Sequence, residues 1–208
     1  GGDGADYDGA LALLASLGAD EVAPLLRARA HELLEHRPEQ TVQMLLEWCA
    51  RAPSLEAAVD EAIRLCSRHR ERLVALLEGI MDAGGRLAPP VAWAALLQLH
   101  LEPSGAEEAV AVVERRRVRA LALLRQPVDN YDAQHALLLC SEHGFDEGVV
   151  LLYERLQQHA ALLRHYMSRG QHEAVLGMCR RLGAQRPQLW LEALRHVAAL
   201  GAATHERQ

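Results

Sequence analysis

The chain has 208 residues, of which half are apolar, 4% aromatic and 24% charged, and its formal net charge is −6. This length suits one large or two small domains, and the acidic balance excludes a general attraction to phosphate backbones, so we expect no nucleic-acid partner. The longest apolar run, residues 9–19, is about half of the ~20 residues that cross a bilayer, so we expect only peripheral membrane association.

Amphipathic helices are predicted along the whole chain. Leu, Ala and Val dominate the apolar residues, and apolar side chains recur three and four positions apart, as in Val42, Leu45, Leu46 and Cys49. Proline and glycine fall between these periodic segments, where helices begin or end. The expected helices cover residues 8–17, 20–35, 38–51, 54–67, 70–83, 89–101, 105–125, 130–143, 146–157, 158–168, 171–182 and 187–200.

Similar segments that recur along the sequence favour an all-α solenoid of stacked antiparallel helix pairs, with about twelve helices, over a closed bundle. YDGALALLASLG (7–18), FDEGVVLLYERL (145–156) and QHEAVLGMCRRLG (171–183) share an acidic residue, a small residue and an apolar run. Such units cannot bury their apolar faces alone, so they stack.

We expect residues 1–208 to form a single solenoid segment of a larger protein, because the chain opens with Gly1-Gly2-Asp3-Gly4 and no Met. Residues 1–7 are expected to be a flexible start and 201–208 a frayed end. Residues 84–90 and 125–130 are expected to separate helical sub-blocks.

One helical stripe is interrupted by a charge. In residues 112–124, Arg117 projects into the apolar face formed by Val113, Leu121 and Leu124. Three alternatives follow: the helix breaks there, Arg117 pairs with a carboxylate, or its side chain extends to water. An unpaired buried guanidinium is too costly, so we expect a break or an extension to water.

The adjacent carboxylates of Asp146 and Glu147 raise the question of acid–base catalysis. Neighbouring helical residues point about 100° apart and do not converge on one substrate atom. We therefore interpret both as first-turn acids that complement the helix dipole. A helical enzyme with a site around His135, His143 and His165 is the alternative from a different class. We predict that the chain is not an enzyme and has no catalytic residues and no small-molecule substrate.

Neither a metal nor a cofactor is expected. The cysteines are widely separated and read as reduced core thiols, and Cys140-x-x-His143 has no second ligand pair to complete a zinc site. A calcium loop on Asp6 and Asp8 fails, because Gly4 and Ala15 stand where carboxylates are required. The cysteines are Cys49, Cys66, Cys140 and Cys179.

The densest positive patch comprises Arg115, Arg116, Arg117 and Arg119. Of these, Arg115, Arg116 and Arg119 are the candidates for contact with anionic lipid or an acidic partner surface. Glutamates that precede them on the same helix favour a plain solvated surface instead.

Two blocks of sequence resemble a known family. Residues 131–194 contain an Ala-Leu-x-Leu-Cys helix, a His-x-Phe turn, Asp/Glu-Gly-Val-x-x-Leu-Tyr-Glu, His-Tyr-Met, and a Val-x-x-x-Cys helix leading to Pro-x-Leu-Trp. Residues 29–56 add Pro-Glu-Gln-Thr before a Leu-rich helix. This pattern resembles the clathrin heavy-chain repeat region of the vacuolar protein sorting-associated protein 11 family. The residues of its repeat signature are Phe145, Gly148, Val149, Leu152, Tyr153, Tyr166, Cys179 and Trp190.

The resemblance implies a scaffold subunit of the class C core shared by the HOPS and CORVET tethering complexes. Its partners would be the other class C subunits, on the cytosolic face of late endosomes, lysosomes or vacuoles. Family members carry a β-propeller and a RING domain, but this chain has no strand-rich segment and no Cys-x-x-Cys pair. Another clathrin-repeat scaffold, such as a vesicle-coat or related sorting subunit, is the alternative.

Overall fold

The computed structural model of the chain describes residues 6–83, 88–103, 105 and 109–205. Within these ranges it contains twelve α-helices, one short 3-10 helix and no strand, so the all-α prediction is confirmed. The elements are α1 Tyr7–Ser16, α2 Ala19–His36, α3 Pro38–Arg51, α4 Leu55–Cys66, α5 Arg70–Asp82, α6 Pro90–Leu101, α7 Val110–Leu124, η1 Val128–Asn130, α8 Ala133–Glu142, α9 Asp146–Arg155, α10 His159–Ser168, α11 His172–Leu182 and α12 Gln188–His205.

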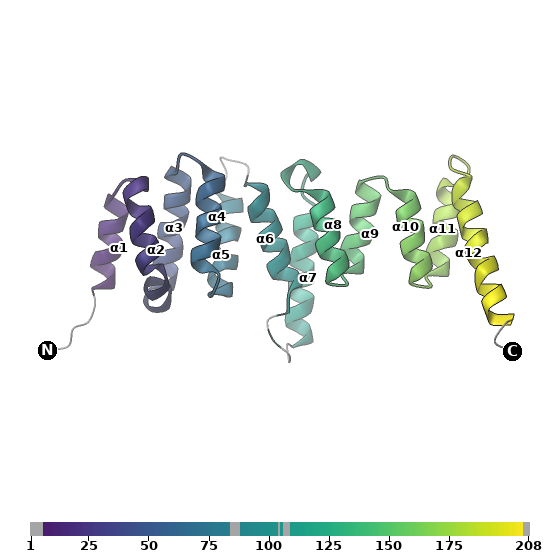
Figure 1. The fold of residues 1–208 in the computed structure, drawn as a ribbon, viewed down its shortest axis with the longest axis horizontal. Coiled ribbons are helices and arrows are strands. Elements are labelled where there is room, and N and C mark those ends of the chain that lie inside the picture. The colour runs from purple at the N-terminus through teal and green to yellow at the C-terminus, as the bar shows by residue number, and fades with distance from the viewer. Residues whose placement is uncertain (1–5, 84–87, 104, 106–108, 206–208) are drawn as a thin grey trace. The chain divides into compact units, whose positions relative to one another are not determined.

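The helices form two compact units, Gly1–Phe145 and Asp146–Gln208. In the first, a helix packs against its neighbour in sequence and often against the next but one: α2 contacts α3 and α4, α3 contacts α5, and α6 contacts both α7 and α8. In the second, α10 contacts α9, α11 and α12. Figure 1 shows successive helices of each unit running in opposite directions. This is the packing of an α-solenoid, and the predicted stacking of antiparallel helix pairs is confirmed.

Local sequence signals set several helix ends. The Asp6 carboxylate accepts a hydrogen bond from the Gly9 amide (2.8 Å) at the start of α1, and the Ser54 hydroxyl accepts one from the Ala57 amide at the start of α4. Pro38 and Pro90 occupy first helical positions, where no amide proton is needed.

Three helix boundaries differ from the predicted ones by three residues or more. Helix α8 begins at Ala133 and not at 130, because η1 precedes it and the Asp132 carboxylate accepts hydrogen bonds from the amides of Gln134 and His135. Helix α7 begins at Val110 and not at 105. Helix α12 continues to His205, beyond the predicted end at 200.

The segments expected to be irregular lie partly outside the described residues. Of the expected flexible start, residues 1–5 lie outside them, while Tyr7 already opens α1. Residues 84–87 and 206–208 also lie outside them. The joint expected at 125–130 is a short connection that contains η1.

The core of each unit is aliphatic. Leu26, Leu45, Leu76 and Leu96 are fully buried in the first unit, and Leu162 and Leu163 in the second. All four cysteines are free and buried, as predicted for core thiols. Burial raises the pKa of Cys49 and Cys140 to about 12 and that of Cys66 to about 11, so these thiols stay protonated at neutral pH.

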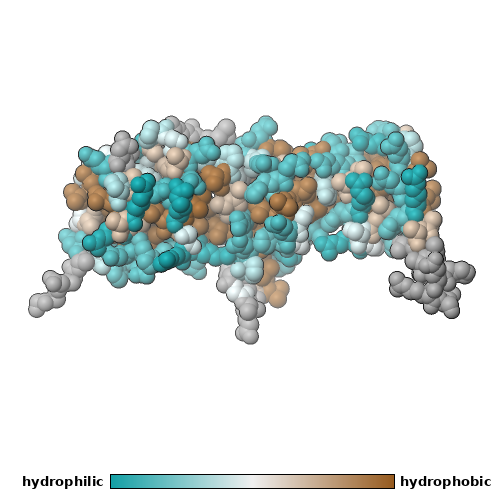
Figure 2. Space-filling view, in the orientation of Figure 1, coloured by the Kyte–Doolittle hydropathy of each residue, from teal (hydrophilic) through white to brown (hydrophobic). Residues whose placement is uncertain are grey.

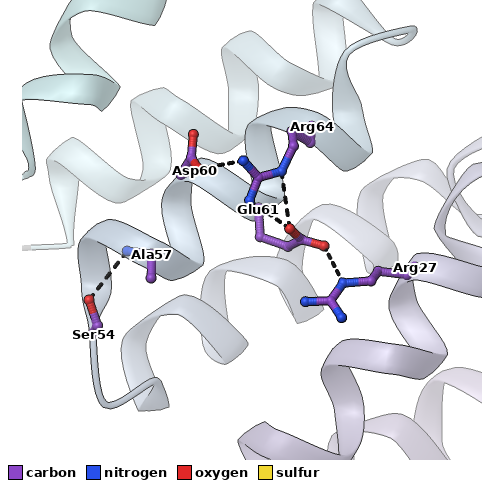
Figure 3. A network of polar contacts seen from close by, with 6 residues as sticks. All are labelled: Arg27, Ser54, Ala57, Asp60, Glu61 and Arg64. Atoms are coloured by element: carbon purple, nitrogen blue, oxygen red, sulfur yellow. Dashed lines mark hydrogen bonds and ion pairs between the residues drawn. The ribbon is translucent and has the colours of Figure 1, made fainter.

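Charged residues on the outside of the first unit pair across neighbouring helices. Glu61 on α4 accepts hydrogen bonds from Arg27 on α2 (2.6 Å) and from Arg64 one turn further along α4, and Arg64 also contacts Asp60 (Figure 3). These hydrogen bonds, first that from Arg27 and then that from Arg64, lower the pKa of Glu61. Since such exposed pairs contribute up to about 1 kcal/mol each, they bias the α2–α4 contact without determining it.

Candidate interaction surfaces

The residues of the repeat signature are mainly packing residues. Phe145 is 1% exposed and lies at the end of the first unit. Gly148, Val149 and Leu152 are buried along α9. Phe145, Val149 and Leu152 therefore contribute to the packing inside the units.

The remaining signature residues lie in the second unit. Cys179 is buried there together with Leu162, Leu163 and Met178, and Tyr153 and Tyr166 pack against this cluster while half-buried. Trp190 on α12 is 36% exposed, and a methyl group built at Gly183 would lie 2.1 Å from its indole Nε1. The absence of a side chain at Gly183 thus makes room for the indole between α11 and α12.

The acidic pair that suggested catalysis belongs to a helix junction. Gly144 has φ +60°, and the Phe145 amide donates to the Cys140 carbonyl (2.8 Å), which together end α8. Asp146 and Glu147 then form the first turn of α9, as predicted. The Asp146 carboxylate accepts a hydrogen bond from Arg169 (2.5 Å) and lies 3.7 Å from Nε2 of His165. The Asp146 carboxylate therefore links the start of α9 to the last turn of α10 through ionic contacts.

The three arginines proposed for lipid or partner contact differ in their surroundings. Arg115 is exposed, Arg116 donates to the Glu102 carbonyl, and Arg119 forms an ion pair with Glu78 (3.2 Å). Two of the three thus already hold α7 to neighbouring parts of the first unit. Their role in contacting other molecules stays a prediction.

Arg117 corrects one expectation. Helix α7 is continuous from Val110 to Leu124, so the predicted break at Arg117 is wrong. Instead, Arg117 is half-buried as a residue, and its guanidinium lies over the Phe145 ring, with Cζ 5.8 Å from the ring centroid. The aromatic face takes the place of a carboxylate partner, because its quadrupole attracts the cation.

The histidines considered for an enzyme site lie in separate environments. His135 lines a small cavity of about 20 Å³ together with Trp93 and Tyr131, whereas His143 lines a different cavity beside Arg117. His165 belongs to the second unit, where its ring lies near those of Tyr153 and Tyr166. Within the described residues, no group of three or more His, Cys, Asp or Glu side chains is arranged to hold a metal ion.

Two features bring apolar side chains to the surface of the units. A groove of about 440 Å³ lies between α3 and α5, lined by Leu46, Cys49 and Ile80 among others. On α12, Leu191, Leu194 and Val197 are more than half exposed. Figure 2 shows apolar residues reaching the surface between otherwise polar areas of both units. Across the described part of the chain, no helix combines the length and apolar character that spanning a bilayer requires.

Stacked antiparallel helix pairs define the class of this protein as an α-solenoid of helical repeats. The profile of the PEP5/VPS11 clathrin repeat family matches residues 2–207. The chain belongs to this family, and the resemblance noted in its sequence is thereby confirmed over nearly the whole chain.

Similar proteins of known name support the same family. The chain is similar to the vacuolar protein sorting-associated protein 11 homologs of Homo sapiens (29% identical over 207 residues) and Dictyostelium discoideum (27% over 139). These alignments cover 93% and 67% of the chain, but 22% and 14% of the relatives. The chain thus spans about a fifth of the length of the human relative. No solved structure matches it significantly.

Proposed function

We propose that this chain is a non-catalytic scaffold segment of a membrane-tethering subunit. It would act in complexes of the HOPS/CORVET kind during vesicle transport from endosomes to lysosomes or vacuoles. The observation that carries the proposal is the family match over residues 2–207 on a chain that folds as stacked helices. Stacked helices hold binding surfaces at set separations, which is the physical task of a tether.

The partners in this proposal are the other class C subunits, and the location is the cytosolic face of late endosome, lysosome or vacuole membranes. The names of the relatives support a role in vacuolar protein sorting. The same match supports a PEP5/VPS11-type sorting subunit over the alternative of a vesicle coat.

Two adjacent leucines of α8 offer a matched test. Leu139 is 6% exposed and Leu138 is 53% exposed, so Leu139→Asp should unfold the local stack while Leu138→Asp should not. Each variant would be placed in the full-length protein and expressed in cells that lack the endogenous copy. Recovery of class C subunits, normalised to the amount of bait, and delivery of an endocytosed cargo to lysosomes would be measured.

The expected result is loss of both signals with Leu139→Asp and retention of both with Leu138→Asp. If Leu139→Asp recovers as much of the class C subunits as the unsubstituted protein does, this segment is dispensable for assembly. Absence of class C subunits from the unsubstituted protein would overturn the proposal entirely.

A further inference from the structure

A cationic cavity lies within the first unit, between α6, α7 and the turn that follows α8. Its volume is about 190 Å³, well above the roughly 10–15 Å³ that one water molecule needs. The lining residues are His100, Leu101, Pro103, Val113, Arg116, Arg117, His143 and Phe145. Four of these are apolar, two are arginines and two are histidines, and none of these described lining residues is acidic.

Arg117 is the cation best placed to meet a ligand. Its guanidinium is held over the Phe145 ring by a contact with the face of the cation, and among the described residues none accepts a hydrogen bond from its edge of N–H donors. The described residues contain no carboxylate within ion-pair distance of it. Arg116, in contrast, is already fixed by the carbonyl of Glu102. A bound anion would therefore find in Arg117 a pre-positioned fork of donors.

His100 lines this cavity and is subject to the positive charges of three arginines. The ring is only 3% exposed, and its Nδ1 has no hydrogen-bond partner among the described residues. Burial, followed by the charges of Arg119, Arg116 and Arg70, lowers the pKa of His100 to about 4. Burial disfavours a charge of either sign, whereas the three arginine charges attract a negative one, so an anion at this cavity gains from the arginines alone.

The nearby described carboxylates do not cancel this charge at the cavity itself. Glu78 pairs with Arg119 at 3.2 Å. Glu102 accepts a hydrogen bond from Gln98 and lies 3.9 Å from Arg70. Both carboxylates are directed to partners that do not line the cavity with Arg117.

We propose that this cavity binds the carboxylate side chain of an acidic residue, preferably glutamate, from a partner protein. The guanidinium of Arg117 would take the two carboxylate oxygens side by side, and the methylene groups would pack on Leu101, Val113 and Phe145. The four apolar lining residues suit a ligand that carries methylene groups next to its anionic head, which inorganic phosphate lacks.

The identity of the partner as a protein rests on the scaffold role proposed above, but binding of the carboxylate does not. The test therefore uses a small probe and no partner. A negative result would leave recovery of class C subunits by the full-length protein untouched, so the two proposals fail separately.

Phe145 makes the experiment selective, because it is the sole phenylalanine of the chain and forms a wall of the cavity. Ring-¹³C-labelled phenylalanine gives NMR signals from this site alone. The chain would be titrated with glutamate blocked as its N-acetyl N-methylamide, which carries one carboxylate, and with the equally blocked glutamine as the neutral isostere. The blocked glutamate should cause a saturable shift, with Kd on the order of millimolar, and the glutamine should not.

Variants of neighbouring arginines supply the controls. Arg117→Gln should weaken binding about tenfold or more, and Arg117→Lys should weaken it less, because it retains the charge but loses the fork. Arg115→Gln removes the same charge from an exposed position outside the cavity and should bind like the unsubstituted chain. Circular dichroism would verify that each variant is folded.

Three results would overturn the proposal. Equal shifts with blocked glutamate and blocked glutamine would show that charge is not recognised. Equal weakening in Arg115→Gln and Arg117→Gln would reduce the effect to general electrostatics. A larger shift with inorganic phosphate, or with phosphatidylserine vesicles at matched ionic strength, would assign the cavity to a phosphate ligand.

Discussion

Gly183 offers a quantitative test of how α11 packs against α12. The substitution is Gly183→Ala, which adds one methyl group. That methyl would lie 2.1 Å from Nε1 and 2.5 Å from Cδ1 of Trp190, and 2.3 Å from the Cys179 carbonyl oxygen. Contacts this short cannot exist, so the indole and the end of α11 must move.

The magnitude follows from two opposing effects. Gly183 has φ −66°, which alanine adopts freely, so the loss of glycine's freedom in the unfolded chain contributes about 0.4–1 kcal/mol of stability. Overpacking a well-filled site costs about 1–3 kcal/mol. We expect a net destabilisation of about 1–2 kcal/mol, which corresponds to a fall in Tm of several degrees for a unit of this size.

Gly177 on the same helix is the matched control. A methyl group built there meets nothing within 4 Å, and the position is exposed, so Gly177→Ala should stabilise the chain by about 0.5–1 kcal/mol. Thermal unfolding by circular dichroism measures both variants. Amide hydrogen exchange, read over α11 and α12, assigns the change to the second unit.

A double-mutant cycle identifies the cause. In a Trp190→Leu background the indole is gone, so Gly183→Ala should cost clearly less than in the unsubstituted chain. Our reasoning fails if Gly183→Ala and Gly177→Ala change Tm in the same direction by similar amounts. It also fails if the cost of Gly183→Ala is the same with and without Trp190.

Three further predictions concern the first unit and the thiols. Because the pKa of His100 is lowered to about 4, the unfolded chain binds a proton there more readily than the folded chain. Stability should therefore fall as pH drops from about 6.5 towards 4, by at most about 3 kcal/mol, and acid unfolding of His100→Leu should lack this component. Asp132→Ala removes the carboxylate that accepts the first amides of α8 and should cost about 1 kcal/mol in urea unfolding, with the exposed Gln134→Ala nearly neutral. The buried thiols should react with Ellman's reagent at pH 8 only after guanidinium is added; rapid reaction of the native chain would contradict their burial.

Most helix positions can be predicted from the sequence, because they depend on residues that are neighbours along the chain. Apolar spacing, first-turn acids such as Asp146 and Glu147, and proline at Pro38 and Pro90 act within one or two turns. The start of α8 was misplaced because the chain forms a 3-10 turn before Asp132 takes the capping role. The 3-10 turn and the Asp132 cap lie within a few residues of each other, and apolar periodicity alone does not show at which of them the helix begins.

The candidate sites were less predictable. The run of basic residues in the sequence points to Arg115, Arg116 and Arg119, whereas the cavity in the structure is lined by Arg116, Arg117 and His100. No local pattern in the sequence marks His100. The one local indication that Arg117 has a special environment is its position in an otherwise apolar helix face. Its meeting with Phe145, on a different element, depends on how α7 packs beside the end of α8.

The amino-acid sequence by itself determined that this chain is a row of short helices and a member of a repeat family, because both follow from local periodicity and recurring motifs. The tertiary structure alone decided which side chains meet across helices: Arg117 with Phe145, and Trp190 with Gly183. The physical reason is that contacts between helices depend on the rotation and approach of whole elements. A difference of a few ångströms in that approach decides whether a charge is paired, stacked on a ring or left to face a cavity.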